Sequence, residues 1–188
     1  ELDTANWFIR QTFGRYVTDE VVADVLDNPE GLELGGEERE VTIFMSDLRG
    51  FTAFAERLSP RQVVAFLNRY LEAMVDVMTT YQGTIDEIIG DGILVLFGAP
   101  IRREDDAERA VHAGLEILSS VAALGPQPIT SPPFVPQVRV GVATGLVVVG
   151  DIIGEGPSEE EAVVGETPNL AARLQSLAEP GTLLISPT

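Results

Sequence analysis

The sequence contains no cysteine and no lysine, and His112 is its only histidine. Without cysteine there is no disulfide, no thiolate nucleophile and no thiolate metal ligand, a composition that leans toward a reducing compartment. The absence of lysine excludes a Schiff-base lysine and a P-loop lysine, so that all twelve basic residues are arginine. With a single imidazole in the chain, oxygen atoms are the expected ligands of any bound metal ion.

Long apolar runs and positive charge are also scarce. No stretch of eighteen apolar residues and no signal-peptide pattern occurs, so we expect no direct membrane contact from this segment and a cytoplasmic location, although a parent protein could be membrane-attached. The formal net charge of -18 disfavours nucleic acid as a partner, because such binding neutralises phosphates. A small phosphorylated ligand fits this charge only if divalent cations screen the repulsion.

The chain divides into a short N-terminal piece and one domain. Residues 6–27 predict an amphipathic helix, and a glycine-containing stretch follows it. We therefore expect a connector helix and linker over residues 1–36 and a domain over residues 37–188, sufficient for one compact core. A helix packed on that domain explains residues 6–27 equally well. Because the chain opens without methionine and ends just after a predicted strand, we expect it to be part of a longer protein.

The domain alternates strand and helix patterns. Strands are predicted at residues 40–48, 84–89, 93–97, 137–145, 147–153 and 162–165 and after residue 181; helices are predicted at residues 60–81, 104–124 and 167–179. Ser59 has the features of an N-cap, with Pro60 at the first helical position and Gln62 completing a capping box. The order predicts an α+β fold with a ferredoxin-like βαββαβ core, a mostly antiparallel sheet and helices on one face.

The segment IDEIIGDGILVLFGAP, residues 85–100, places two carboxylates inside apolar strand sequence. Burying such a group without a partner costs on the order of several kcal/mol. Asp47 ends the first predicted strand and Asp91 lies at the tip of a predicted hairpin, so both can meet at one end of the sheet. Two carboxylates, a backbone carbonyl and nucleotide phosphate oxygens form a typical magnesium environment. Taken alone, each aspartate is also explained as a strand-end cap or a turn residue.

Two further patterns are compatible with phosphate chemistry. Gly50, Phe51 and Thr52 form a turn into a helix, whose backbone N–H groups could cradle phosphate. Asn169 and Arg173 are four residues apart and lie on one helix face. An amide beside a guanidinium can orient a sugar and neutralise charge on a phosphoryl group. A solvated polar stripe is the alternative explanation of that helix face.

The motifs SDLRGFT, IGDG, VRVGVATG and VVGETPNLAARL occur in this order. Together they resemble the catalytic domain of the class III nucleotidyl cyclases, the adenylate and guanylate cyclase family, from about residue 38 to the C-terminus. The resemblance implies a homodimer with two active sites at the subunit interface, a nucleoside triphosphate substrate (GTP or ATP) and two Mg²⁺ or Mn²⁺ ions. It also implies in-line attack of the ribose 3′ oxygen on the α-phosphorus, with a 3′,5′-cyclic nucleotide and pyrophosphate as products.

The family's site residues can be carried over by position. Asp47 and Asp91 match its two metal-binding aspartates, and the carbonyl of Leu48 is a further expected ligand. Asn169 matches the ribose-orienting asparagine, and Arg173 matches the arginine that stabilises the transition state. In the family's arrangement the aspartates of one chain face the asparagine and arginine of the other.

Glu87 and Ala162 match the two positions that read the purine base. The first is typically lysine in adenylate cyclases and glutamate in guanylate cyclases. A carboxylate accepts hydrogen bonds from guanine N1–H and the 2-amino group but repels adenine N1, a mismatch of about 2–5 kcal/mol. Glu87 therefore favours GTP and cGMP. Ala162 offers neither base a hydrogen bond, which leaves ATP and cAMP as the alternative.

Other roles depend on the same resemblance. Arg139 in VRVGVATG matches a phosphate-contacting arginine. A family lysine on a later strand has no counterpart here, and together with Ala162 this leaves open a catalytically weak, regulatory cyclase-homology domain. A connector helix before the domain would suit coupling to an upstream sensor domain in the parent protein.

Overall fold

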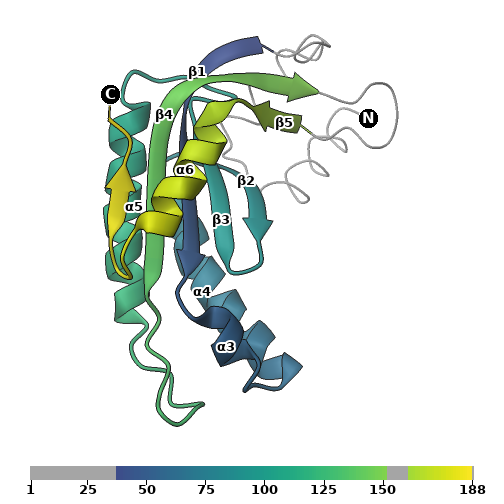
Figure 1. Cartoon of the computed structure of the whole chain (residues 1–188), viewed down its shortest axis with the longest axis vertical. Coiled ribbons are helices and arrows are strands. Elements are labelled where there is room, and N and C mark those ends of the chain that lie inside the picture. The colour runs from purple at the N-terminus through teal and green to yellow at the C-terminus, as the bar shows by residue number, and fades with distance from the viewer. Residues whose placement is uncertain (1–36, 152–160, 188) are drawn as a thin grey trace, which may run out of the picture.

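The computed structural model describes residues 37–151 and 161–187 of the chain. Within these ranges it is an α+β structure with a mostly antiparallel sheet (Figure 1). The strands are β1 (Glu37–Leu48), β2 (Thr84–Ile89), β3 (Gly92–Phe97), β4 (Val138–Asp151), β5 (Glu161–Val164) and β6 (Leu183–Ile185), and the helices are α3 (Phe51–Ala55), α4 (Pro60–Thr80), α5 (Asp106–Ala123) and α6 (Glu166–Leu177). The expected connector helix lies outside the described residues.

The sheet has the order β2-β3-β1-β4-β5, and β6 pairs with β4 off this path. Neighbours along the path are antiparallel, whereas β6 runs parallel to β4. The first four strands in this order form the ferredoxin-like core that the sequence predicts. The expectation of two separate strands over residues 137–145 and 147–153 is wrong, because β4 runs unbroken through Gly145.

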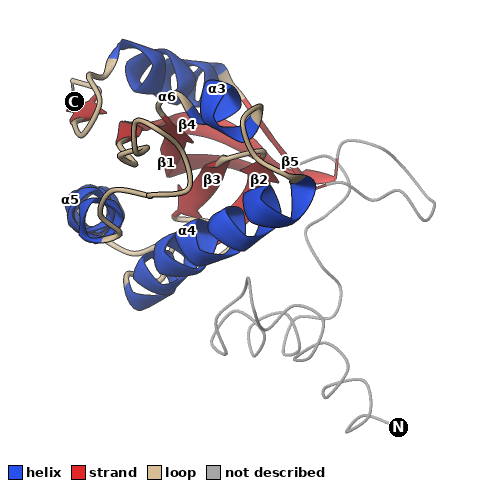
Figure 2. Ribbon diagram, turned by 90° about the horizontal axis from the view of Figure 1, so that it is seen from below, coloured by secondary structure: helices blue, strands red, loops and turns tan. Residues whose placement is uncertain are grey.

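Helices cover both faces of the sheet, which corrects the prediction of helices on one face. On one face α4 and α5 pack over a core that includes Phe44, Val95 and Val140. On the other face α6 packs through Ala171 and Leu174 on a second core built around β1 and β4. Figure 2 shows the sheet between these two layers. Side chains of successive β1 residues alternate between the two cores, as a strand buried on both faces requires.

Gly141 allows α6 to lie directly on β4. A Cβ atom added at Gly141 would stand 2.3 Å from the carbonyl oxygen of Ala171 and 2.3 Å from the backbone nitrogen of Gln175. Any larger residue would therefore push the helix backbone away from the strand. This close approach fixes the position of α6, the helix that carries Asn169 and Arg173.

The start of α4 follows its local sequence. The hydroxyl of Ser59 and the amide of Gln62 form the predicted capping box, and Pro60 occupies the first turn. Ahead of α4, the short helix α3 replaces part of the turn that the sequence indicated. Phe54 of α3 stacks on Phe134 with ring centroids 4.1 Å apart, which ties α3 to the loop before β4. No described helix is long and apolar enough to cross a membrane.

Candidate active site

Asp47 and Asp91 meet at one end of the sheet, as the sequence predicts. Asp47 is the second-last residue of β1, and Asp91 forms the turn between β2 and β3. The backbone N–H of Leu48 donates a hydrogen bond of 3.0 Å to Oδ2 of Asp91. This bond ties the hairpin turn to the end of β1 and holds the two carboxylates side by side.

Gly92 is required by the same approach of hairpin and strand. A Cβ atom at this position would lie 2.2 Å from the carbonyl oxygen of Ser46, a backbone atom that cannot rotate away. The next residue, Ile93, directs its N–H toward the hydroxyl of Ser46 at 3.4 Å. Glycine therefore brings the β3 backbone close enough for the Asp91 side chain to reach the amide of Leu48.

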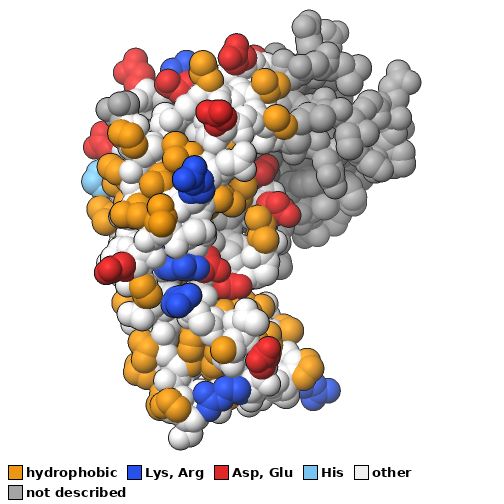
Figure 3. All heavy atoms as spheres, in the orientation of Figure 1, with side chains coloured by type: hydrophobic (Ala, Val, Ile, Leu, Met, Phe, Trp, Pro, Cys, Tyr) orange, Lys and Arg blue, Asp and Glu red, His pale blue; other side chains and the backbone are white. Residues whose placement is uncertain are grey.

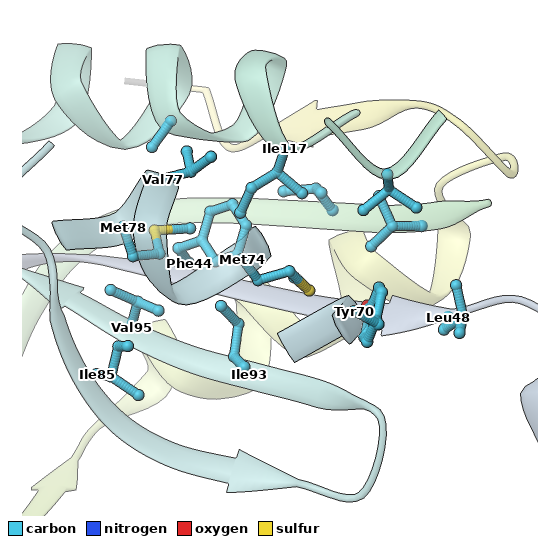
Figure 4. Close-up of a cluster of buried hydrophobic side chains, with 14 of the residues drawn as sticks. Phe44, Leu48, Tyr70, Met74, Val77, Met78, Ile85, Ile93, Val95 and Ile117 are labelled. Carbon is cyan, nitrogen blue, oxygen red and sulfur yellow. The ribbon is translucent and has the colours of Figure 1, made fainter. Parts of the chain in front are cut away.

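The two carboxylates influence each other electrostatically. Burial raises the pKa of the Asp91 carboxyl above its ordinary value, the hydrogen bond from Leu48 opposes that shift, and the charge of Asp47 adds to it. Beneath them, Tyr70 of α4 is fully buried, and its hydroxyl has no hydrogen-bond partner among the described residues. Burial, followed by the charges of Asp91 and Asp47, raises the pKa of this hydroxyl. Figure 4 shows Tyr70 beside Leu48 in the core below the site.

Arg139 stands opposite Asp47 in the β1–β4 ladder. Its Nη2 donates to Oδ2 of Asp47 in a short ion pair, and its Nη1 lies 3.4 Å from the carbonyl oxygen of Ser176 in α6. The sequence analysis expected Arg139 to contact phosphate, and in this chain without nucleotide its partner is Asp47. Figure 3 shows basic and acidic side chains next to one another on this face of the molecule.

The donor set at this end of the sheet fits a hard divalent cation. Within the described residues no three His, Cys, Asp or Glu side chains converge to hold a metal ion. A cation here would use carboxylate oxygens of Asp47 and Asp91 and the carbonyl of Leu48, completed by phosphate oxygens, and all of these are ligands that Mg²⁺ accepts. Burial, and to a smaller extent the charge of Asp47, raises the pKa of Asp91, and a bound cation would favour the ionised form of this carboxyl.

Glu87 reaches its position through a β-bulge. The β2–β3 register shifts between Ile85 and Glu87, so Asp86 is the extra residue and Glu87 stands opposite Leu94. Leu94 belongs to the core on the α6 side of the sheet, and residues opposite one another in a ladder share a face. The bulge therefore places Glu87 on the same sheet face as α6, where it is exposed and makes no hydrogen bond or ion pair with other described residues.

Asn169 and Arg173 are exposed on α6, on the side away from Ala171. In the described part of the chain neither side chain makes a hydrogen bond or an ion pair, and neither contacts the two aspartates by such a bond. Leu170 and Leu177 are exposed on the same helix, at 38% and 71%. The polar pair is thus presented outward, beside apolar surface, instead of being joined to the carboxylates of its own chain.

The remaining predicted residues lie around this centre. Gly50 caps α3 with a φ of 75°, and because the first bond within α3 runs from the Phe54 N–H to the Gly50 carbonyl, the amides of residues 51–53 are not used by the helix. The ring of Phe51 stacks on Phe66 with centroids 6.1 Å apart, and Thr52 is exposed. Ala162 stands opposite Gly150 in the β4–β5 ladder.

A surface hollow of about 490 Å³ lies elsewhere, lined by residues such as Glu38, Glu40 and Leu146. These residues are at the beginning of β1 and in the second half of β4, about 23–30 Å along the strand from Asp47. The carboxylate pair is therefore the chemically meaningful site, and the hollow is separate from it.

Sequence reasoning missed three features of the site. The sequence of β2 gives no sign of the bulge at Asp86, because its apolar and polar residues are also compatible with a regular strand. The pairing of Arg139 with Asp47 depends on the register of two strands ninety residues apart. Tyr70 lies among Phe66, Met74 and other buried residues at helical spacing in α4, so in the sequence it resembles an ordinary core residue. Its hydroxyl group, in an otherwise apolar series, is the only feature that could have pointed to the site.

Comparisons with known proteins agree with this geometry. The family model "Adenylate and Guanylate cyclase catalytic domain" matches residues 36–188. The structure resembles the crystal structure of the guanylyl cyclase Cya2, with a TM-score of 0.74 and 45% identity over 81% of this chain and 77% of that chain. It equally resembles the adenylyl cyclase CyaB from P. aeruginosa, with a TM-score of 0.74 and 34% identity over 81% and 79% of the two chains.

A curated relative extends beyond the region of similarity. An uncharacterized protein of Mycobacterium tuberculosis is 35% identical over 180 residues, which are 95% of this chain and 31% of that protein. The chain thus spans about a third of the length of this relative. The family model covers most of the sequence, and the solved structures share its sheet and helices. This chain belongs to the adenylate and guanylate cyclase catalytic domain family.

Proposed function

We propose that the chain is a purine nucleotide cyclase that converts a nucleoside triphosphate, preferentially GTP, into a 3′,5′-cyclic nucleotide and pyrophosphate. The observation that carries this proposal is the pair of carboxylates, Asp47 and Asp91, held together by the Leu48 amide at the end of a family-typical sheet. In this family's fold such a pair is explained by metal-assisted phosphoryl chemistry.

Asp47, Asp91 and the Leu48 carbonyl would hold two Mg²⁺ or Mn²⁺ ions, which supply Lewis-acid activation of the ribose 3′-OH and neutralise the triphosphate. Asn169 orients the ribose so that its 3′ oxygen is in line with the α-phosphorus. Arg173 donates to the non-bridging oxygens as charge develops on them. The amides of residues 50–52 bind the phosphate chain at the start of α3.

We propose a homodimer with shared sites, because Asn169 and Arg173 are exposed on α6 and make no hydrogen bond or ion pair with other described residues. A second chain that covers the outer face of α6 would also bury Leu170 and Leu177. The guanylyl cyclase domain of the RhoGC fusion protein from Blastocladiella emersonii, 28% identical with a TM-score of 0.69, forms a non-canonical dimer in one crystal structure and is monomeric in another. In a closed twofold dimer both sites are equivalent.

Glu87 supports GTP as the preferred substrate. The bulge at Asp86 leaves this carboxylate exposed and without an ion pair to the rest of the described chain, so it can accept two hydrogen bonds from guanine. The guanylate cyclase domain of RhGC from Catenaria anguillulae, 30% identical with a TM-score of 0.70, was solved in complex with GTP. ATP is the second candidate substrate, favoured by the similarity to an adenylyl cyclase and left open by Ala162, whose side chain has no donor or acceptor for either base.

Product formation tests the proposal directly. The purified protein would be incubated with Mn²⁺ and either GTP or ATP, and the products separated by chromatography. We expect cGMP to exceed cAMP, and expect neither product from Asp47→Asn. Predominant cAMP would support the ATP alternative. No product from either substrate would refute the catalytic proposal and favour a regulatory cyclase-homology domain.

Mixing two inactive variants tests the shared sites. Asp47→Asn and Arg173→Ala would each be inactive alone, because each removes one part of both sites. In a random mixture half of the dimers contain one chain of each kind, and each of these has one intact site, so about a quarter of the wild-type activity should return. Recovery of no activity after subunit exchange would contradict sites built from both chains.

A further inference from the structure

Arg139 forms an ion pair with the carboxylate of Asp47, which is one of the metal ligands in the proposed function. Its Nη2 is bound to Oδ2 of Asp47, and the two side chains are 19% and 34% exposed. The strand register places them directly opposite one another, so the contact is built into the sheet. A guanidinium is therefore the cation that neutralises Asp47 in this structure.

The other anchors of this guanidinium are weak. Its Nη1 reaches only the carbonyl oxygen of Ser176, at 3.4 Å, near the limit of a hydrogen bond. Its Nε is buried, and no acceptor for it lies among the described residues. A buried donor without a partner is unfavourable, so little besides Asp47 holds the arginine head in this position.

The charges decide what happens when a divalent cation arrives. Asp47 and Asp91 together carry two negative charges, and Arg139 returns one positive charge to them. A divalent cation on the same carboxylates would stand beside the guanidinium at a few ångströms, where like charges repel. Because Arg139 has a long side chain and weak secondary contacts, its movement is the least costly response.

We propose that Arg139 is an internal counter-ion of Asp47 that a divalent cation displaces, so that the guanidinium becomes available to the nucleotide phosphates only in the metal-loaded site. This inference rests on the proposed function for the identity of the metal ligands. It gives Arg139 two successive partners. It also makes the arginine a competitor of the metal ion, in addition to being a ligand of the substrate.

Binding of Mn²⁺ to the nucleotide-free protein tests the competition. Free Mn²⁺ would be followed by electron paramagnetic resonance during titration of the wild type, Arg139→Gln and the control Arg109→Gln. Arg109 is a matched control, since it is 12% exposed and ion-paired with Asp105 and Asp106, away from the site. The charge-assisted contact between Arg139 and Asp47 should weaken Mn²⁺ binding by about one to two powers of ten in the dissociation constant. Without this contact, Arg139→Gln should bind Mn²⁺ about tenfold more tightly than the wild type, and Arg109→Gln should match the wild type.

Two further variants make the titration specific. Asp47→Asn should bind Mn²⁺ more weakly and should cancel the gain when combined with Arg139→Gln. Arg139→Lys keeps the charge but loses the planar fork, so its affinity should fall between those of the wild type and Arg139→Gln. Equal or weaker Mn²⁺ binding by Arg139→Gln, in a protein with wild-type circular dichroism, would overturn the proposal.

Displacement must also be distinguished from simple repulsion across the site. The Nε–H signal of Arg139 in ¹⁵N NMR, assigned by its loss in Arg139→Gln, should shift and become more mobile on addition of Mg²⁺. The signal of Arg109 should stay unchanged. An Arg139 signal that does not respond to saturating Mg²⁺ would show that the arginine remains on Asp47, and would refute displacement.

Neither measurement depends on catalytic turnover, so a failure of this inference can be distinguished from a failure of the proposed function. A chain that makes no cyclic nucleotide but shows tighter Mn²⁺ binding in Arg139→Gln would lose its assigned activity and retain the competing arginine. If the protein is an active cyclase but Arg139→Gln binds Mn²⁺ with wild-type affinity, the proposed function stands and this inference is refuted.

Discussion

Replacing Gly92 by alanine tests the geometry that joins the two carboxylates. The new Cβ atom would lie 2.2 Å from the carbonyl oxygen of Ser46, whereas an ordinary contact needs at least 3.4 Å. The oxygen belongs to the backbone of β1, in the centre of the sheet, so it cannot move aside cheaply. The β2–β3 hairpin must therefore open by more than about 1 Å, and Asp91 moves with it away from the Leu48 amide.

The expected magnitude follows from that displacement. Overpacking of this kind typically costs 1–3 kcal/mol, and a backbone contact belongs at the upper end, so we expect Gly92→Ala to lose about 3 kcal/mol of unfolding free energy. For a chain of 188 residues this corresponds to a fall in Tm of about 6–12 °C. A displacement of 1 Å at a catalytic group can cost about 100-fold in rate, which is the expected loss of Mn²⁺-dependent activity.

Thermal unfolding by circular dichroism and product formation with Mn²⁺ would measure both effects. Gly90→Ala is the matched control on the same turn, because its φ of 63° strains an alanine but no atom lies within 4 Å of the added Cβ. It should lose about 1–2 kcal/mol and keep its activity within about threefold. If Gly92→Ala were as stable and as active as Gly90→Ala, the close approach of β3 to β1 would be refuted.

Three other substitutions have definite expected outcomes. Glu87→Lys should lower the ratio of kcat/KM for GTP to that for ATP by at least about 30-fold, as measured by product chromatography, while Glu72→Lys on the exposed side of α4 leaves it unchanged. Because the pKa of Asp91 is raised, the stability that its protonated form provides is present at low pH and lost as the pH rises through that pKa. In chelator, the stability of Asp91→Asn relative to the wild type should therefore rise as the pH increases above about 4 in urea unfolding, and a constant difference would contradict this. Tyr70→Phe removes a buried hydroxyl without a partner and should raise the unfolding free energy by about 1 kcal/mol; a clear loss would show that the hydroxyl is bonded.

The parts of the fold that follow from the sequence are those decided within a few residues. The capping box of Ser59 and Gln62 sets the start of α4 through contacts between positions three apart, so the local sequence is sufficient. The hairpin around Asp91 is equally local, because glycine at positions 90 and 92 marks a turn between two apolar runs. The meeting of Asp47 with Asp91 then follows from the order of the strands.

The errors lie where tertiary contacts decide. Gly145 resembled a turn between two strands, yet it lies opposite Val41 inside the β1–β4 ladder. Its missing side chain leaves room for the Thr167 hydroxyl, which a Cβ atom would approach to 2.6 Å. The placement of α6 on the face opposite to α4 and α5 is also decided by tertiary contacts. Strand β1 has apolar residues on both faces, and its sequence does not indicate which helix covers which face.

Glu87 shows how one inserted residue decides the chemistry of a site. If Asp86 instead paired with Leu94, the register that joins Ile85 to Val95 would continue, and Glu87 would stand opposite Ile93, on the side of the sheet that carries α4 and α5. That place in the ladder is taken by Ile88, and a carboxylate there would lie on the face opposite to α6. The bulge turns it to the face that carries α6 and the Asp47–Arg139 pair. The sheet face of the residue that reads the base in the proposed function is therefore set by a backbone irregularity. A regular β2–β3 ladder with Asp86 opposite Leu94 would turn Glu87 away from α6 and remove base recognition, while leaving every predicted site residue in the sequence.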